Sequence, residues 1–118
     1  MIPRARKRAP MGVKTGDVIR CASHLAWLRT RQCAVARAAG HVCEGKIEAA
    51  HVRSGTDGGI GIKPSDIYAL PLCAGGHREQ HCIGEAAFER RYGIDLKQIA
   101  AEHAKASPHR RKWEQLHD

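Results

Sequence analysis

Aromatic residues are scarce in this sequence, at 4% of its 118 residues. A chain of this length with so few large rings builds a small core, and such domains are often stabilised by a metal, a disulfide or a partner. No apolar run reaches the roughly 18 residues of a membrane-spanning helix. The basic N-terminus also lacks the apolar stretch of a secretory signal. We therefore expect one cytoplasmic domain that makes no use of a membrane.

Acidic residues are also few, because 12 Asp and Glu face 20 Lys and Arg, which leaves a formal net charge of +8. Residues 1–20 carry six basic side chains and one acidic one, whereas residues 21–102 carry ten and nine. We predict a basic flexible arm over residues 1–20, a folded domain over 21–105 and a basic tail over 106–118. An excess of positive charge favours a polyanionic partner, most often a nucleic acid.

The pattern of apolar residues predicts an α+β fold with a very small sheet. Ser23 is the expected cap of a helix that ends before Gly40. The expected elements are a helix over 23–39, strands over 46–53 and 67–72, a glycine-rich loop between them, and helices over 76–93 and 95–105.

Eight histidines and five cysteines are a heavy load of metal-binding side chains for this length. Because the cysteine count is odd and no signal peptide is present, a disulfide framework explains these cysteines less well than metal binding does. His77 and His81 are four residues apart in HREQH, so on a helix both imidazoles lie on one face and can chelate one divalent ion. Surface histidines also reach this spacing by chance, so the pair needs its context.

That context is His51, at the end of a predicted strand upstream of the pair. A metal held on a helix could stabilise the pentacovalent phosphorus and the departing 3′ oxygen of a phosphodiester. A neutral histidine across from the metal could take the proton of the attacking water, because imidazole titrates near pH 6.5. The pattern therefore suits phosphodiester hydrolysis.

The run through EAAHVR, KPSD, PLC, HREQH and GEAAF resembles the HNH, or ββα-metal, nucleases. It is most similar to the phage- and prophage-associated branch that includes the RecA-dependent nuclease of phage P1, over about residues 24–100. The resemblance implies a small ββα-metal core with flanking helices and a metal-dependent DNA endonuclease from a bacterial or phage-infected cell. It also implies that His51 is the general base and that His77 and His81 bind the catalytic metal.

The third metal ligand is open, because Ala50 stands where many relatives have an acidic residue or a histidine. Asp66 falls near the central Asn of the family, where it could orient the loop or provide the third ligand. Glu48 and His51 are the other candidates. Histidine ligands suit Zn²⁺, whereas an added carboxylate and waters would admit Mg²⁺ or Mn²⁺.

Many relatives also hold a structural zinc between two Cys-x-x-Cys pairs. This chain keeps Cys33 and Cys73 but lacks the second cysteine of each pair. Cys43 and His41 lie close enough in sequence to substitute, so we predict a second zinc site from Cys33, Cys43, Cys73 and one more ligand. The alternative is that these thiols are ordinary buried apolar groups.

The DNA contacts that we predict come from residues beside the site and from the N-terminal arm: Arg53, Lys63, Arg78, Arg4, Arg6, Lys7 and Arg8. One base and one metal cut one strand, so a double-strand break would need a homodimer or two successive nicks. An alternative function is a non-catalytic nucleic-acid-binding zinc module of the same fold. A third is an accessory factor that docks on a recombination protein such as RecA.

Overall fold

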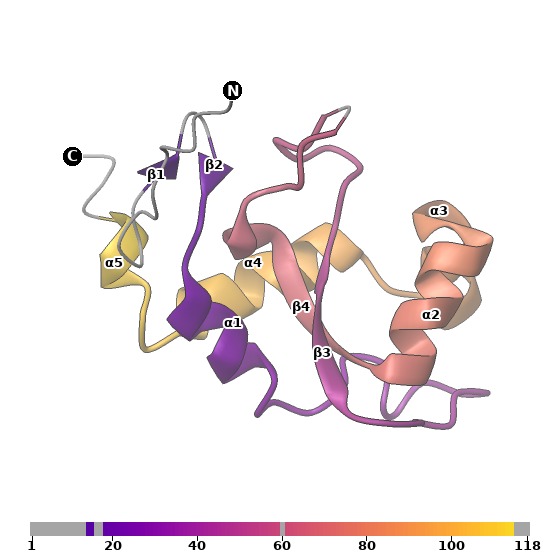
Figure 1. The fold of residues 1–118 in the computed structure, drawn as a ribbon. Helices are drawn as coiled ribbons and strands as arrows, with labels where there is room; N and C mark the ends of the chain where they lie inside the picture. Colours follow the sequence, from indigo (N-terminus) through magenta and orange to yellow (C-terminus); the bar gives the residue numbers. More distant parts are fainter. Residues whose placement is uncertain (1–13, 16–17, 60, 115–118) are drawn as a thin grey trace.

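Two antiparallel strands, β3 (Ile47–His51) and β4 (Ala69–Cys73), run through the middle of the α+β fold (Figure 1). The computed structural model of the chain describes residues 14–15, 18–59 and 61–114. The other described elements are β1 (Lys14–Thr15), β2 (Val18–Ile19), α1 (Ala22–Leu28), the 3-10 helix η1 (Asp66–Tyr68), α2 (Ala74–Ile83), α3 (Glu85–Tyr92), α4 (Leu96–Ala106) and α5 (Arg111–Glu114). The predicted α+β class is confirmed.

β4 forms the centre of the main core, since all five of its residues are buried. β3 is only partly buried and pairs with it in a register that sets His51 opposite Ala69. Pro71 is tolerated in β4 because this sheet has two strands, and its carbonyl accepts the N–H of Ala34 at 2.8 Å. The buried members of this core are Cys33, Val35, Ala50, Val52, Leu70, Leu72, Cys73, Phe88, Leu96 and Ala100.

β4 is followed by α2, α3 and α4, which two glycines and a cap separate from one another, and then by the short α5. Gly84, at φ 90°, ends α2 and begins α3, so the helix predicted over 76–93 is two helices. Gly93 ends α3 in the left-handed conformation. The Asp95 side chain then accepts the N–H of Gln98 at 3.0 Å, which confirms the predicted cap of the last long helix.

The long helix predicted over 23–39 is wrong. α1 spans Ala22–Leu28, and its N-cap is Cys21 rather than Ser23. Helix propensity favours the continuation of α1 beyond Leu28, but Cys33 and Val35 are both buried in the core beside the sheet. Burial of these side chains against β4 therefore outweighs local propensity, and the chain turns back toward the sheet.

Both predicted domain boundaries differ from the structure. Ile19 is 3% exposed and packs with Trp113, which is 5% exposed, in a second, smaller core. The folded part therefore begins before residue 21 and extends beyond residue 105, because burial of these two apolar side chains draws the flanking segments in. Residues 1–13, 16–17 and 115–118 lie outside the described part. Within that part, no helix has the length and apolarity to cross a membrane.

Candidate functional site

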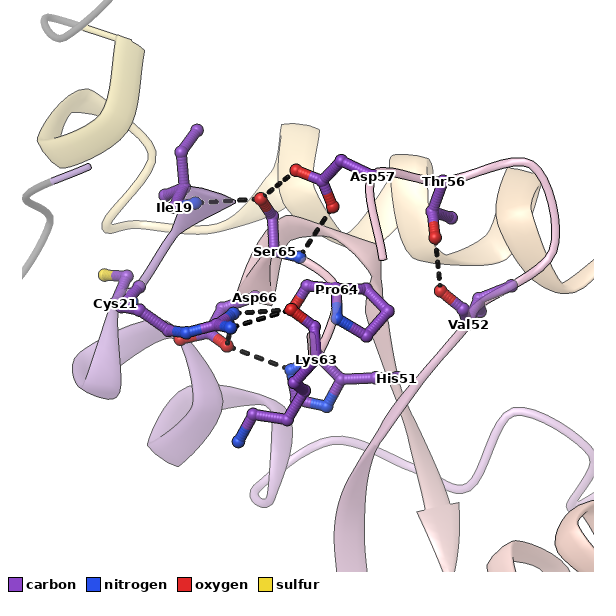
Figure 2. Close-up of polar contacts among 11 residues, drawn as sticks. Ile19, Cys21, His51, Val52, Thr56, Asp57, Lys63, Pro64, Ser65 and Asp66 are labelled. Atoms are coloured by element: carbon purple, nitrogen blue, oxygen red, sulfur yellow. Dashed lines mark hydrogen bonds and ion pairs between the residues drawn. The ribbon is translucent and has the colours of Figure 1, made fainter. Parts of the chain in front are cut away.

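His51 is the last residue of β3, and the chain returns to it through η1. Because β3 and β4 pair with His51 opposite Ala69, the residues just before β4 lie beside the imidazole. Asp66, the first residue of η1, places Oδ1 at 2.9 Å from His51 Nε2 (Figure 2). The base predicted from the sequence is therefore in contact with a carboxylate.

The Asp66 carboxylate is buried and holds a charge. Burial raises its pKa, but the hydrogen bonds from His51 and from the Cys21 N–H, together with the Arg20 guanidinium, outweigh burial and lower the pKa below its usual value. The Cys21 N–H donates to Oδ2 at 2.7 Å, and Arg20 Nη1 lies 3.5 Å from Oδ1. A carboxylate only accepts hydrogen bonds, so His51 Nε2 carries the proton and Nδ1 keeps a free lone pair.

Arg20 also fixes the loop that presents Asp66. Its guanidinium donates to the carbonyls of Lys63, at 2.7 Å, and Pro64. Ser65 is held between the Asp57 carboxylate and the N–H of Ile19, which donates to Ser65 Oγ at 2.8 Å (Figure 2). Arg20 was predicted to lie in a flexible arm, but Ile19 next to it is buried in a core cluster, and this apolar residue was the available signal that the segment is folded.

His77 and His81 lie on α2 with their Nε2 atoms 3.2 Å apart. Two imidazole nitrogens bound to one ion at about 2.0–2.1 Å, with bond angles of about 90–109°, lie roughly 2.9–3.4 Å apart. The pair thus already has the spacing of a chelate.

Glu48 contacts His77 on the side away from His81. Its Oε1 lies 2.7 Å from His77 Nδ1, so an Nδ1–H of His77 donates to the carboxylate and Nε2 keeps the lone pair. This carboxylate–histidine arrangement fixes metal-binding imidazoles in many proteins. Glu48 therefore orients His77, and the described residues show no contact of Asp66 with His77 or His81. The role of Asp66 as a metal ligand stays a prediction.

A cavity of about 320 Å³ is lined both by His51, the proposed base, and by His81 of the histidine pair. It opens where the end of β3 faces α2 and the start of α3. The Glu85 carboxylate accepts the N–H groups of Arg53, at 2.7 Å, and Ser54, at 2.9 Å, and so fixes the rim. The cavity is lined by His51, Arg53, Ser54, Gln80, His81, Gly84, Glu85 and Ala86.

The residues predicted to bind DNA lie in different environments in the structure. The Arg53 guanidinium donates to the carbonyls of Gly59, at 3.0 Å, and Ile62, at 3.3 Å, so it organises the glycine-rich loop at the cavity rim. Arg78 pairs with Glu44 at 3.2 Å on the surface, and Lys63 is exposed. The remaining four, Arg4, Arg6, Lys7 and Arg8, lie outside the described residues.

A second group of ligands lies at the other end of the sheet. Cys33, His41, Cys43 and Cys73 each place one ligand atom within 4.8 Å of the others, so the cluster could hold a metal ion. Tetrahedral zinc sets thiolate and imidazole ligands roughly 3.3–3.8 Å apart. Cys73 Sγ and His41 Nε2 are already at 3.5 Å. His41, which the sequence offered together with Cys43 as a substitute for a missing cysteine, is the fourth member of the cluster.

The start of α2 is built around the Cys73 sulfur. The N–H groups of Glu44, at 3.4 Å, and Gly76, at 3.2 Å, donate to Sγ. Burial raises the pKa of the Cys73 thiol, but these N–H groups and the His41 ring outweigh burial and lower the pKa to about 7. A Cβ at Gly76 would lie 3.4 Å from both Cys73 Sγ and His41 Cε1, in van der Waals contact with the two side chains. The second cysteine of the common pair is thus replaced here by a close backbone approach.

Comparison with known proteins finds one family model that matches, over residues 14–115, and the family is described as a protein of unknown function (DUF968). No curated protein and no solved structure matches the chain.

Proposed function

The chain belongs to the DUF968 family, and we propose that it is a metal-dependent DNA endonuclease of the HNH type that hydrolyses phosphodiester bonds. One observation carries the proposal: the carboxylate-bound imidazole of His51 and the chelating imidazole of His81 line the same cavity. An acid–base group and a metal-binding group that face one space are the two components that phosphodiester hydrolysis needs.

His77 and His81 would hold the catalytic metal through their Nε2 atoms. Their donor set fits Zn²⁺, and with added waters it also fits Mn²⁺ or Mg²⁺. A divalent ion bound there stabilises the negative charge that develops on the phosphate and on the leaving oxygen. Ala50 is buried and has no donor atom, so it would supply no ligand to this metal.

His51 would act as the general base. Water attacks phosphorus, and its proton moves to His51 Nδ1, the ring nitrogen that Asp66 leaves free. The bond from phosphorus to the 3′ oxygen breaks, and that oxygen then takes a proton from solvent. The products are a 5′ phosphate and a 3′ hydroxyl. Asp66 orients the ring and stabilises the imidazolium that forms, because its own charge is maintained by Arg20 and the Cys21 N–H.

We assign zinc to the cluster of Cys33, His41, Cys43 and Cys73. Three thiolates and one imidazole are a donor set that selects zinc, and four protein ligands leave no open position for a reaction. This zinc would be structural and would join the 33–43 segment to the start of α2. A homodimer and a recombination protein such as RecA remain predicted partners.

The same cluster favours a second candidate function, a non-catalytic nucleic-acid-binding zinc module. A structural zinc holds the fold whether or not the cavity performs chemistry. The two candidates differ in what the His77 and His81 pair does: a nuclease needs a metal there, whereas a binding module does not.

A plasmid-nicking assay tests the proposal. The full chain, with its zinc content measured beforehand, is incubated with supercoiled plasmid and Mg²⁺, Mn²⁺, Ni²⁺ or Zn²⁺, with and without EDTA. We expect nicked circles with at least one added metal and none with EDTA. A folded, zinc-loaded chain that binds the plasmid but leaves it intact with every metal would contradict the nuclease and favour the binding module.

A further inference from the structure

Lys97 places a positive charge at the rim of the cavity, although it belongs to none of the predicted sites. It is the second residue of α4, and its Nζ donates to the Gly55 carbonyl at 3.0 Å. Ser54, the residue before Gly55, lines the cavity. Gly55 has a φ of 72°, and a Cβ there would lie 2.9 Å from Lys97 Nζ, so glycine permits this close approach. A helix distant in sequence thus brings an ammonium group next to the cavity lining.

The charge of Lys97 is not neutralised within the described part of the chain. None of the ion pairs of the described residues involves Lys97. The acidic residue of the rim, Glu85, uses its two carboxylate oxygens to accept the N–H groups of Arg53 and Ser54. An ammonium group has three donors, and the Gly55 carbonyl takes one of them. Two donors and the full charge are therefore available to a ligand at the rim.

Neither the stability of α4 nor the contact with Gly55 requires a lysine at this position. The N-terminus of a helix carries a partial positive charge, so a cation in its first turn is unfavourable. At this end of α4 the carboxylates of Glu89 and Asp95 accept the N–H groups of Leu96 and Gln98. The Gly55 carbonyl needs a donor, but that donor need not be charged. An anion bound at the rim would give the charge of Lys97 a partner.

We infer that Lys97 binds a phosphate of the substrate DNA next to the scissile one. The inference rests on the proposed nuclease function, which puts the scissile phosphate in the cavity. Each DNA strand carries one negative charge per about 3.4 Å of helix axis. A strand that is cut in the cavity therefore passes its neighbouring phosphates over the rim, where the ammonium group lies. Lys97 contributes affinity and strand position, and it touches no reacting atom.

Lys97→Gln tests the inference, because glutamine removes the charge and keeps a donor for the Gly55 carbonyl. Binding to a duplex is measured without added metal at several salt concentrations, so that the result does not depend on cleavage. We expect the slope of log affinity against log salt to fall in magnitude by about 0.9, and the affinity at 0.1 M salt to fall roughly 5- to 10-fold, because one phosphate contact is lost. Lys97→Arg keeps the charge and should restore the slope.

Lys105→Gln is the matched control. Lys105 is also exposed on α4, but it lies in the last turn and lines a separate cleft beside Trp113. This variant should keep the slope of the wild type. A Lys97→Gln chain with the same slope and affinity as Lys105→Gln would overturn the inference.

Cleavage gives a second readout, with the metal that supports the wild type. In Lys97→Gln the DNA concentration for half the maximal rate should rise, while the single-turnover rate at saturating DNA stays close to the wild type. A lower melting temperature and a lower saturated rate with an unchanged salt slope would show a purely structural role and would also overturn the inference. A wild type that binds the duplex but cleaves it with no metal would refute the proposed function, and the salt slopes would still decide the Lys97 contact.

Discussion

Asp66 determines which nitrogen of His51 carries the proton. Asp66 is 2% exposed. Its carboxylate accepts hydrogen bonds from His51 Nε2 and from the Cys21 N–H, and it forms an ion pair with the Arg20 guanidinium. Because its pKa is lowered, the carboxylate stays ionised well below neutral pH. The proton therefore resides on His51 Nε2, and Nδ1 is available as the base.

Asp66→Asn should slow cleavage strongly with little effect on DNA affinity. An asparagine amide cannot stabilise the imidazolium, and if its N–H donates to Nε2 it selects the wrong tautomer. We expect a loss of about 10²- to 10⁴-fold in the single-turnover rate, the range seen when a base loses its orienting carboxylate. Asp95→Asn, which alters only the cap of α4, is the control and should cleave normally. A wild-type rate in Asp66→Asn would show that His51 needs no carboxylate.

His24 is a buried histidine that the proposed reaction does not use. Its ring is 0% exposed, lies between Trp27 and Trp113, and contacts Ser107 Oγ through Nδ1 at 2.9 Å. Burial lowers its pKa from 6.5 to about 4. The folded chain thus keeps His24 neutral at pH values where the unfolded chain protonates it.

The pKa of His24 predicts a loss of stability in acid. Above pH 6.5 both states are neutral and the group has no effect. As pH falls from 6.5 to about 4, the unfolded state binds the proton first, and up to about 3 kcal/mol of stability is lost. Urea unfolding at pH 7 and pH 4.5 should show this loss in the wild type and much less of it in His24→Phe. An equal loss in both chains would rule His24 out as its source.

Residue-level roles were predictable where the sequence carried a local pattern. His51, His77 and His81 stood in recognisable strings, and the structure brings His51 and His81 to one cavity. Arg20 and His41 had no such pattern. Their partners are 44 and 32 residues away in sequence, so only the tertiary fold brings them together.

At the scale of elements, α2 serves two sites at once. Its N-terminus is built on the Cys73 sulfur, and its middle carries His77 and His81. A metal in the cysteine cluster would therefore fix the position of the helix that carries the proposed metal-binding pair. The strands and α4 were predictable from periodicity and capping. The end of α1 was not, because burial of Cys33 and Val35 overrides helix propensity.

Loss of the cluster metal should destabilise the whole domain. We expect purified wild-type chain to hold at least one tightly bound zinc and Cys33→Ser to lose it. Stability should fall by several kcal/mol, because structural zinc contributes directly to folding. Cys82→Ser is the control, since Cys82 is an exposed cysteine on α2 that lies outside the cluster. A metal-free wild type, or a Cys33→Ser chain as stable as Cys82→Ser, would contradict the assignment.

At the scale of the whole molecule, the excess positive charge and the residues of the proposed site are separated along the chain. The segment over 21–102, which holds both ligand clusters, is nearly neutral, whereas residues 1–20 carry six basic side chains and one acidic. We assign non-specific, salt-sensitive DNA affinity mainly to the ends. The sequence predicted the α+β class, but not the domain boundaries, because Ile19 and Trp113 meet only in three dimensions.

The most direct test of the central claim is the cleavage rate of His51→Ala at saturating duplex DNA, with the metal that supports the wild type. We expect the rate to fall at least about 10³-fold, since the base is removed, while DNA affinity, zinc content and melting temperature stay close to the wild type. His109→Ala, a histidine outside the cavity lining, is the control and should cleave normally. Cleavage by His51→Ala at the wild-type rate would contradict the account.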